Sequence, residues 1–344
     1  MTSVQTLFLE GHDQQDKALQ EYLDSLPDLG ARLSELNMYH RLTGHVWDTS
    51  AADEPVWLAA RDRDLTFAAY SRLDRKLRLE ERGRSTLPDI TPAYGGCPIV
   101  KPNLPWQQQG RQFAYTMPIN QRPYAFLIQP QNFKFTDGHA TMASDRDEPQ
   151  DWRPRQSTLH WRILDMHAVT AMLRRYVLLW NGAGAGVSIP ERFHLHVVPK
   201  LDSLPIQQAA RLMGLPSGWP SVLRLTGAVW PVTAFRISGP PEFVASEVVR
   251  LAARWNHLAG ERACESMAMF VEDEMVVCIY VPRDRKRERS NGFGSAVGAY
   301  EVAVGVFIFS DEKPGIALRE RRIHFDDLWQ ILRDVQPEME FPCE

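Results

Sequence analysis

The chain has 344 residues, of which 44% are hydrophobic and 24% are charged, an ordinary balance for a globular protein. That length suits two domains, or one duplicated domain, with a sizeable core. The formal net charge of −4 excludes a general basic surface for nucleic acid or a membrane, so local groups must hold any phosphate-bearing ligand.

Cysteine usage and the N-terminus indicate the compartment. The four cysteines show no C-x-x-C spacing, which argues against a disulfide framework and a cysteine zinc site and fits a reducing compartment. The N-terminus lacks a basic region followed by an apolar one, and no stretch of 18 apolar residues occurs. We expect a cytoplasmic protein without a membrane span.

Residues 1–110 are expected to form an N-terminal helical region followed by a connector. Leucines recur at helical spacing between Leu19 and Leu26, and residues 64–82 (DLTFAAYSRLDRKLRLEER) continue in the same style. Residues 86–123 are rich in proline and glycine, which predicts an extended connector on the surface.

Residues 111–215 are expected to form one half of a duplicated fold. YAFLIQP and HATMAS are typical of strands, and a turn with Asp137 and Gly138 lies between them. Residues 158–180 predict a long helix that ends at Asn181 and Gly182. A glycine-rich stretch, NGAGAGVSIPE, leads into the short strand RFHLHVV, and residues 202–220 read as a loop.

Residues 216–344 repeat this order more loosely. Residues 228–238 and 299–310 predict strands, residues 241–258 and 325–335 predict helices, and residues 266–283 predict a β-hairpin with an acidic turn. Strands, a long helix and strands again, occurring twice, predict an α+β fold built from two related halves.

The strand at residues 192–198 carries the candidate chemistry. Side chains alternate along a strand, so Arg192, His194 and His196 share one face. A neutral imidazole is a competent nucleophile toward phosphorus, a second histidine can hold its tautomer or donate a proton, and a guanidinium can neutralise phosphate charge. The same residues also allow two other interpretations, a metal-binding pair and a solvated or structural pair.

This pattern resembles the active-site strand of the histidine-triad superfamily. The glycine-containing Asn segment and F-H-L-H-V-V resemble the branch of galactose-1-phosphate uridylyltransferases and dinucleoside-polyphosphate phosphorylases, with GDP-hexose (GDP-galactose and GDP-glucose) phosphorylases closest. Gly138-His139, and then Pro149-Gln150 before the long helix, agree with that branch. The resemblance covers roughly residues 110–335 and implies a duplicated histidine-triad-like fold, an antiparallel sheet with packed helices and an N-terminal helical extension.

The resemblance also implies residue roles. His194 would be the nucleophile that takes up the nucleotidyl group, and His196 the third triad histidine, with Arg192 in place of the first. In an alternative register His194 is the first histidine and His196 the nucleophile. The substrate-binding residues would be Arg192 and a further set from the glycine-rich stretch and the turn before the second strand: Asn181, Gly182, Gly184, Ser188 and His139. Asn181 can equally cap the long helix.

The implied function is a nucleotidyl transferase or phosphorylase that acts on a nucleoside-diphosphate sugar or a dinucleoside polyphosphate through a covalent nucleotidyl-histidine, with inorganic phosphate as acceptor. It implies neither a cofactor nor a metal, and it implies a homodimer. Three alternatives remain open: a catalytically weakened nucleotide-binding or regulatory protein, suggested by Arg192; a metal-dependent hydrolase that uses His139, His194 and His196; and an interaction protein.

Overall fold

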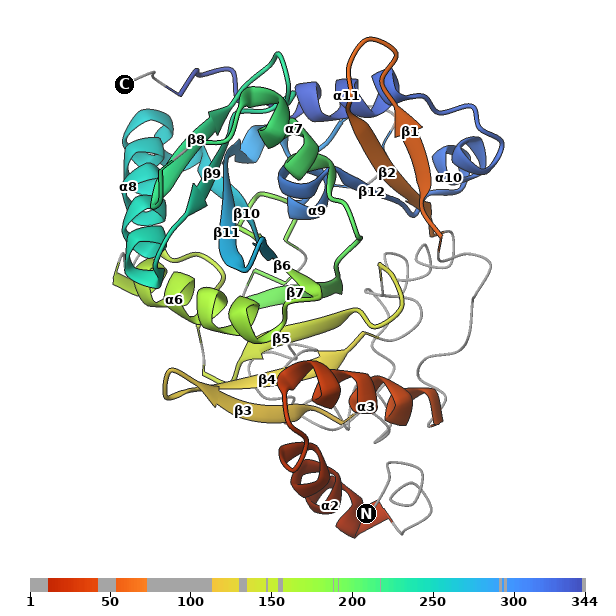
Figure 1. Ribbon diagram of the computed structural model, residues 1–344, viewed down its shortest axis with the longest axis vertical. Coiled ribbons are helices and arrows are strands. Elements are labelled where there is room, and N and C mark those ends of the chain that lie inside the picture. The colour runs from red at the N-terminus through yellow and green to blue at the C-terminus, as the bar shows by residue number, and fades with distance from the viewer. Residues whose placement is uncertain are drawn as a thin grey trace.

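A computed structural model gives the structure of the protein. It describes residues 12–42, 54–72, 113–129, 135–146, 148–153, 157–187, 189–190, 192–216, 218–290, 293 and 296–341. A large antiparallel sheet runs through the middle of the molecule, helices cover both of its faces, and a smaller sheet stands beside it (Figure 1). The α+β prediction is therefore confirmed.

The large sheet has nine strands within the described ranges, in the order β3-β4-β5-β7-β6-β10-β11-β9-β8. Their bounds are β3 Tyr115–Ile119, β4 Arg122–Ile128, β5 Ala140–Ser144, β6 Tyr176–Asn181, β7 His194–Pro199, β8 Ser221–Leu225, β9 Ala234–Ser238, β10 Ala263–Glu272 and β11 Met275–Asp284. The strand that carries the histidine pair, β7, lies near the middle, between β5 and β6.

Apart from β3 at one edge, the strand order is a mirror image about its centre. On one side β4-β5-β7-β6 lead to the centre, and on the other β8-β9-β11-β10 lead to it. Helix α6 (Ser157–Met172) connects β5 to β6, and α8 (Pro241–Ala259) connects β9 to β10 in the same way. The two helices pack against each other on one face of the sheet (Figure 1). Two topologically equivalent units therefore make up the sheet, as the repeated pattern predicted.

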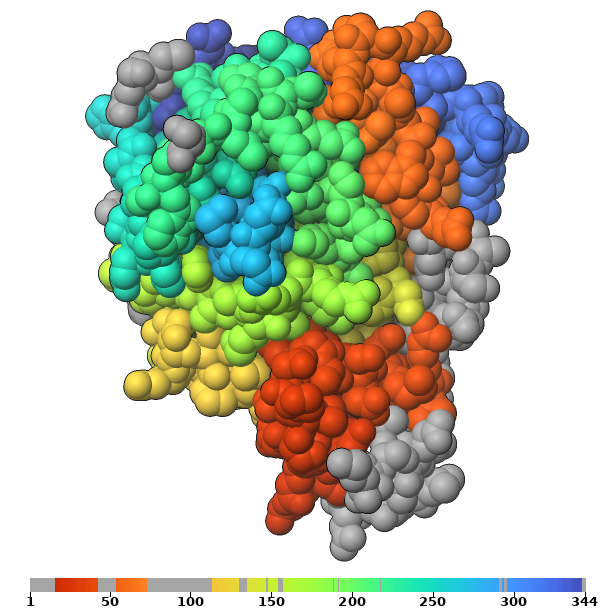
Figure 2. Space-filling view, in the orientation of Figure 1, coloured from red at the N-terminus to blue at the C-terminus, as the bar shows by residue number. Residues whose placement is uncertain are grey.

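One face of the sheet is covered by α6, α8 and two N-terminal helices, α2 (His12–Asp24) and α3 (Leu29–Leu42). Figure 2 shows α2 and α3, in red, forming one end of the molecule. From β7, Leu195 and Val197 enter this core, where they join Ile163 of α6. Burial of both apolar side chains fixes the register of β7, because a shift by one residue would turn them to the opposite face.

The opposite face is covered by C-terminal elements and the smaller sheet. The helices there are α7 (Pro205–Met213), α9 (Ala299–Val304), α10 (Glu312–Arg319) and α11 (Phe325–Asp334), and two short 3-10 helices are η5 (Gly260–Arg262) and η6 (Arg285–Arg287). The smaller sheet consists of β1 (Val56–Ala59), β2 (Thr66–Ser71) and β12 (Val306–Phe309), with β12 parallel to β2. His194 and His196 lie on this face of the sheet, because Val198, which shares their face of β7, packs into the core here.

Several predicted elements are confirmed. Residues 124–128, 140–144 and 194–199 are strands, residues 263–284 form a hairpin with Asp273 and Glu274 at its turn, and α8 and α11 are helices. None of the helices in the described part of the chain is long and apolar enough to cross a membrane. The predicted boundaries at residues 110 and 215 between the helical region and the two halves stay predictions.

Five predicted elements are wrong. Residues 205–213, expected in a loop, are helix α7, and residues 115–119, expected in the connector, are strand β3, which pairs with β4. The long helix ends at Met172 instead of residue 180, and residues 176–181 are a strand that is buried on both faces, so its apolar run shows no strand alternation. Residues 66–71 are strand β2 instead of helix, because they pair with β1 and β12. Residues 299–310 contain α9 and then β12 instead of one strand, because Gly305 adopts a left-handed conformation that ends the helix.

Candidate active site

The histidine pair lies on a central strand of the large sheet, and both rings are at least partly buried. His196 pairs with Thr141 of β5 and Leu179 of β6, which fixes the strand on both sides. His194 is 4% exposed and His196 is partly buried. The two imidazole rings are nearly perpendicular, with their centroids 5.6 Å apart. His194 is therefore the more enclosed of the two rings.

The backbone of residue 192 determines which nitrogen of His194 carries a proton. Arg192 is buried and lies two residues before His194, just outside the hydrogen-bonded strand. Its carbonyl oxygen is 2.8 Å from Nδ1 of His194. A carbonyl oxygen can only accept, so Nδ1 must be the protonated nitrogen. In the neutral ring, Nε2 then carries the lone pair that a nucleophile needs.

His139 determines the tautomer of His196. His139 lies just before β5 and is 1% exposed. The backbone N–H of Phe135 donates to its Nδ1 over 2.9 Å, and its Nε2 is 3.1 Å from Nδ1 of His196. Because Nδ1 of His139 accepts, Nε2 is the protonated nitrogen and donates to His196. A neutral His196 therefore carries its proton on Nε2.

Aromatic rings support this histidine pair from behind. The Phe135 ring stacks on His139 with centroids 4.3 Å apart, and lies 5.8 Å from the ring of Tyr300 at an angle of 22°. Nη1 of Arg72 donates to the carbonyl oxygen of Phe135 over 3.0 Å. Burial raises the pKa of the Tyr300 phenol well above its usual value, so the ring is a neutral wall. The Phe135 peptide is thus held on both sides.

Gln150 fixes the backbone of His194 and is a residue that the sequence analysis did not assign to the site. Its side-chain amide accepts from the His194 N–H (2.9 Å) and donates to the carbonyl oxygens of Asn181 (2.8 Å) and His194 (3.2 Å). It therefore bridges β6 and β7 at the point where direct pairing between them has ended. The only sequence signal was its place after Pro149 in the segment that carried the resemblance.

The glycine-rich stretch packs against the neighbouring half of the sheet. The backbone N–H of Gly182 donates to the carbonyl oxygen of Glu265, and a Cβ there would lie 2.6 Å from that oxygen. Gly184 has a φ of +87°, and a Cβ there would lie 2.5 Å from Cγ of Arg285. These close approaches require glycine. They give both residues a packing role, whereas the predicted phosphate contact stays a prediction.

Asn181 does not cap the long helix, because that helix ends nine residues earlier, at Met172. Its Oδ1 accepts from the backbone N–H of Ala299 over 2.6 Å, so it caps the first turn of α9 in the second half. Ser188 lies outside the described residues.

The geometry of the three histidines does not suit a shared metal ion. His139 and His196 direct nitrogens at each other, and Nδ1 of His194 is directed at a carbonyl oxygen. Within the described ranges, no group of three or more His, Cys, Asp or Glu side chains could hold a metal. This geometry weakens the interpretation of a metal-dependent hydrolase.

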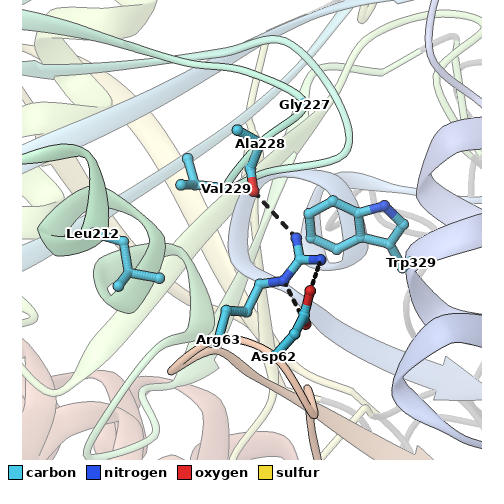
Figure 3. A pocket seen from close by; sticks show the side chains of 7 residues that line it. All are labelled: Asp62, Arg63, Leu212, Gly227, Ala228, Val229 and Trp329. Carbon is cyan, nitrogen blue, oxygen red and sulfur yellow. Dashed lines mark hydrogen bonds and ion pairs between the residues drawn. The ribbon is translucent and has the colours of Figure 1, made fainter.

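A separate pocket of about 520 Å³ lies between the β1–β2 turn, α7, the loop at residues 227–229 and α11 (Figure 3). Its guanidinium, from Arg63, is already bound: it lies 4.6 Å from the Trp329 ring centroid and donates to Asp62 and to the Ala228 carbonyl. None of its lining residues belongs to the histidine site, so we place the candidate site on β7.

No family model and no curated protein matches the sequence. Solved structures of yeast Ap4A phosphorylase Apa2 do match the fold. The complex with AMP has a TM-score of 0.60 at 13% identity, and covers 92% of this chain and 96% of that chain. The unliganded enzyme has a TM-score of 0.59 at 14% identity, covering 90% and 95%. The complex with Ap4A has a TM-score of 0.59 at 13% identity, covering 90% and 98%. At these identities, the likeness shows that this chain shares their fold.

Proposed function

We propose that this chain is a nucleotidyl transferase or phosphorylase that forms a covalent nucleotidyl intermediate on His194. The observation that carries the proposal is the contact between Nδ1–H of His194 and the Arg192 carbonyl, which puts the lone pair on Nε2. The substrate that we favour is a dinucleoside polyphosphate, because the matched structures are described as complexes of a phosphorylase with AMP and Ap4A.

In the first step, Nε2 of His194 attacks the α-phosphorus of the substrate. A nitrogen–phosphorus bond forms, the phosphoanhydride bond breaks, and its electron pair leaves on the oxygen of the departing nucleotide. The imidazole becomes positively charged, which strengthens the hydrogen bond from Nδ1–H to the Arg192 carbonyl. Nε2–H of His196 stabilises charge that develops on the phosphoryl oxygens.

In the second step, an oxygen of inorganic phosphate attacks the same phosphorus. The nitrogen–phosphorus bond breaks, its electrons return to Nε2 of His194, and a nucleoside diphosphate leaves. With a dinucleoside tetraphosphate, the two products are one nucleoside triphosphate and one nucleoside diphosphate. With a nucleoside-diphosphate sugar, a sugar phosphate leaves in the first step instead.

Arg192 in place of a first histidine is compatible with this mechanism. The group that orients His194 is the backbone carbonyl of residue 192, which every amino acid has. The alternative register, with His196 as the nucleophile, has less support: Nδ1 of His196 faces His139 and not a backbone carbonyl of its own strand.

The test is covalent labelling. The protein is incubated with Ap4A, or separately with GDP-hexose, each carrying ³²P at the α-phosphate, without inorganic phosphate. We expect an acid-labile adduct on His194 with Ap4A, and its release as nucleoside diphosphate on addition of phosphate. His194→Ala should abolish the adduct, whereas His257→Ala, on an exposed face of α8, should keep it. An adduct that forms only with GDP-hexose would mean that the substrate is a nucleoside-diphosphate sugar instead of a dinucleoside polyphosphate. No adduct with either nucleotide, and equal turnover in His194→Ala, would refute the enzyme.

A further inference from the structure

We infer that His139 holds His196 as a neutral hydrogen-bond donor, so that the site cleaves phosphoanhydrides and not nucleotidyl esters or amidates, whose leaving groups must be protonated. This inference rests on the proposed function, because it concerns the leaving group in the first step of that reaction. It names the substrate class and gives His139 a positioning role that acts through His196.

The hydrogen bonds from Phe135 through His139 to His196 run in one direction. The N–H of Phe135 donates to Nδ1 of His139, and Nε2–H of His139 donates to Nδ1 of His196. The direction is fixed at its start by a backbone N–H, which cannot accept. All donors in this chain therefore point the same way, and the last one is Nε2–H of His196.

These hydrogen bonds oppose protonation of His196. An imidazolium carries a proton on both nitrogens. If His196 took up a proton on Nδ1, that N–H would face Nε2–H of His139 at 3.1 Å. His139 could accept only by moving its own proton to Nδ1, which would then face the N–H of Phe135 at 2.9 Å. Protonation of His196 therefore places two donors against each other at one of these two contacts.

The Phe135 peptide, where this series of hydrogen bonds begins, is held in place. The Phe135 carbonyl accepts from Arg72, and the Phe135 ring lies between the rings of His139 and Tyr300. Arg72 directly follows β2, Phe135 lies in the loop before β5, and Tyr300 lies on α9, so these side chains come from three separate parts of the fold. Rotation of the Phe135 peptide would break the bond to Arg72 or the ring stacking.

The consequence is chemical. A general acid must hold a proton that it can release near neutral pH, as an imidazolium does and a neutral imidazole N–H does not. When Nε2 of His194 displaces a nucleoside phosphate, the electron pair of the broken P–O bond stays on a phosphate oxygen, which is stable as an anion. When an amine or an alkoxide leaves, the same electron pair needs a proton, which this His196 does not supply.

The experiment compares four adenylyl donors that share AMP and differ in the leaving group: Ap4A, the p-nitrophenyl ester, the phenyl ester and the phosphoramidate of AMP. General acid assistance contributes about 10²–10⁴-fold. We therefore expect adenylation of His194 by the phenyl ester and the phosphoramidate to be at least ~100-fold slower than by Ap4A, with the p-nitrophenyl ester between them. Comparable rates for Ap4A and the phosphoramidate would overturn the inference.

Two substitutions at residue 139 separate positioning from mere packing. His139→Phe keeps a ring against Phe135 and removes the donor, so His196 can become protonated and the phosphoramidate-to-Ap4A rate ratio should rise at least ~10-fold. His139→Gln offers an amide that can either donate to or accept from His196, so its ratio should lie between those of the unsubstituted protein and His139→Phe. His257→Phe on exposed α8 is the matched control and should leave the ratio unchanged. An unchanged ratio in His139→Phe would contradict the role given to His139.

A direct measurement does not depend on turnover. Long-range ¹H–¹⁵N spectra of histidine-labelled protein at pH 7 distinguish the two neutral tautomers and the cation. We expect His194 in the Nδ1–H form, and His139 and His196 in the Nε2–H form. A cationic or Nδ1–H His196 would overturn the inference even if the protein is active. If the tautomers are as expected and no donor labels His194, the proposed function fails and not the hydrogen-bond chain.

Discussion

Replacement of Gln150 by leucine tests whether the side-chain amide holds the backbone of the candidate nucleophile. Gln150 is completely buried, and its amide is the group that links the ends of β6 and β7. Leucine has a similar size but neither donor nor acceptor. The substitution therefore leaves the His194 N–H and the Asn181 and His194 carbonyl oxygens without this partner. The backbone contact from the Gln150 N–H to the Pro190 carbonyl can persist.

The expected loss of stability follows from the two shorter of these contacts, to the His194 N–H at 2.9 Å and to the Asn181 carbonyl at 2.8 Å. A buried polar group left without its partner costs about 1–3 kcal/mol, so the two together should lower the free energy of unfolding by about 2–6 kcal/mol. A typical domain has only about 5–15 kcal/mol in total, so the lower end of this range is already easy to measure. Gln150→Glu should lose at least as much at neutral pH, because a buried carboxylate can accept from the His194 N–H but would face the Asn181 and His194 carbonyl oxygens.

The assay is urea unfolding followed by circular dichroism, with linear extrapolation to water. The matched control is Gln330→Leu. The Gln330 amide donates to Asp334 on the exposed face of α11, and its loss should change stability by less than about 0.5 kcal/mol. A loss below about 1 kcal/mol in Gln150→Leu would refute the reasoning, because at least one buried group would then have found another partner.

Three further predictions concern residues around the site. Burial raises the pKa of the Glu265 carboxyl, which accepts from Trp152 Nε1. A raised pKa in the folded state stabilises the fold at low pH, and this contribution is lost as the pH rises above the usual value of 4.5. Glu265→Gln should therefore be more stable than the unsubstituted protein at pH 7, and its unfolding free energy should change less between pH 5 and 8. A larger pH dependence in the variant would contradict this sign. Burial raises the pKa of the Cys264 thiol to about 12, so iodoacetamide at pH 8 should leave it unlabelled by peptide mass spectrometry until urea unfolds the chain; labelling of the folded protein would show that the site opens. Asn181→Ala should lower the free energy of unfolding by about 1 kcal/mol, because it removes the cap from the Ala299 N–H, and thermal unfolding with no change in midpoint would disprove the cap.

The sequence predicts elements best where a local pattern is unambiguous. Strand β7 alternates polar and apolar side chains, and its apolar members Leu195 and Val197 do enter the core. The hairpin of β10 and β11 was recognisable from two apolar runs about an acidic turn, and α11 from its helical spacing. Strand β6 was missed because a strand in the centre of a sheet is apolar on both faces, so it continues the apolar run of α6 without a change in period.

The candidate site was predictable only in part, for a related reason. That His194 and His196 share a face follows from the strand itself. The contacts that give each ring its tautomer come from His139, which is 57 residues from His196 along the chain, and from the backbone. Gln150 is likewise 44 residues from the strand that it fixes. Such contacts depend on the pairing of β5, β6 and β7, and no local pattern specifies them.

The duplicated sheet explains why only one of its halves carries the histidines. The strand pairs β6–β7 and β10–β11 each begin four residues after the preceding helix. Tyr176 pairs with Pro199 in the first pair of strands, as Ala263 pairs with Asp284 in the second. In this register Ile279 and Val281 of β11 occupy the positions that His194 and His196 have in β7. Both are fully buried in the core under the smaller sheet, where a polar ring would lack water. The second half contributes in another way. Its helix α9 is capped by Asn181, next to the site strand, and carries Tyr300, the ring that packs behind Phe135 and thereby supports His139. A deletion of the second half should therefore abolish the orientation of His139 as well as the fold of the sheet.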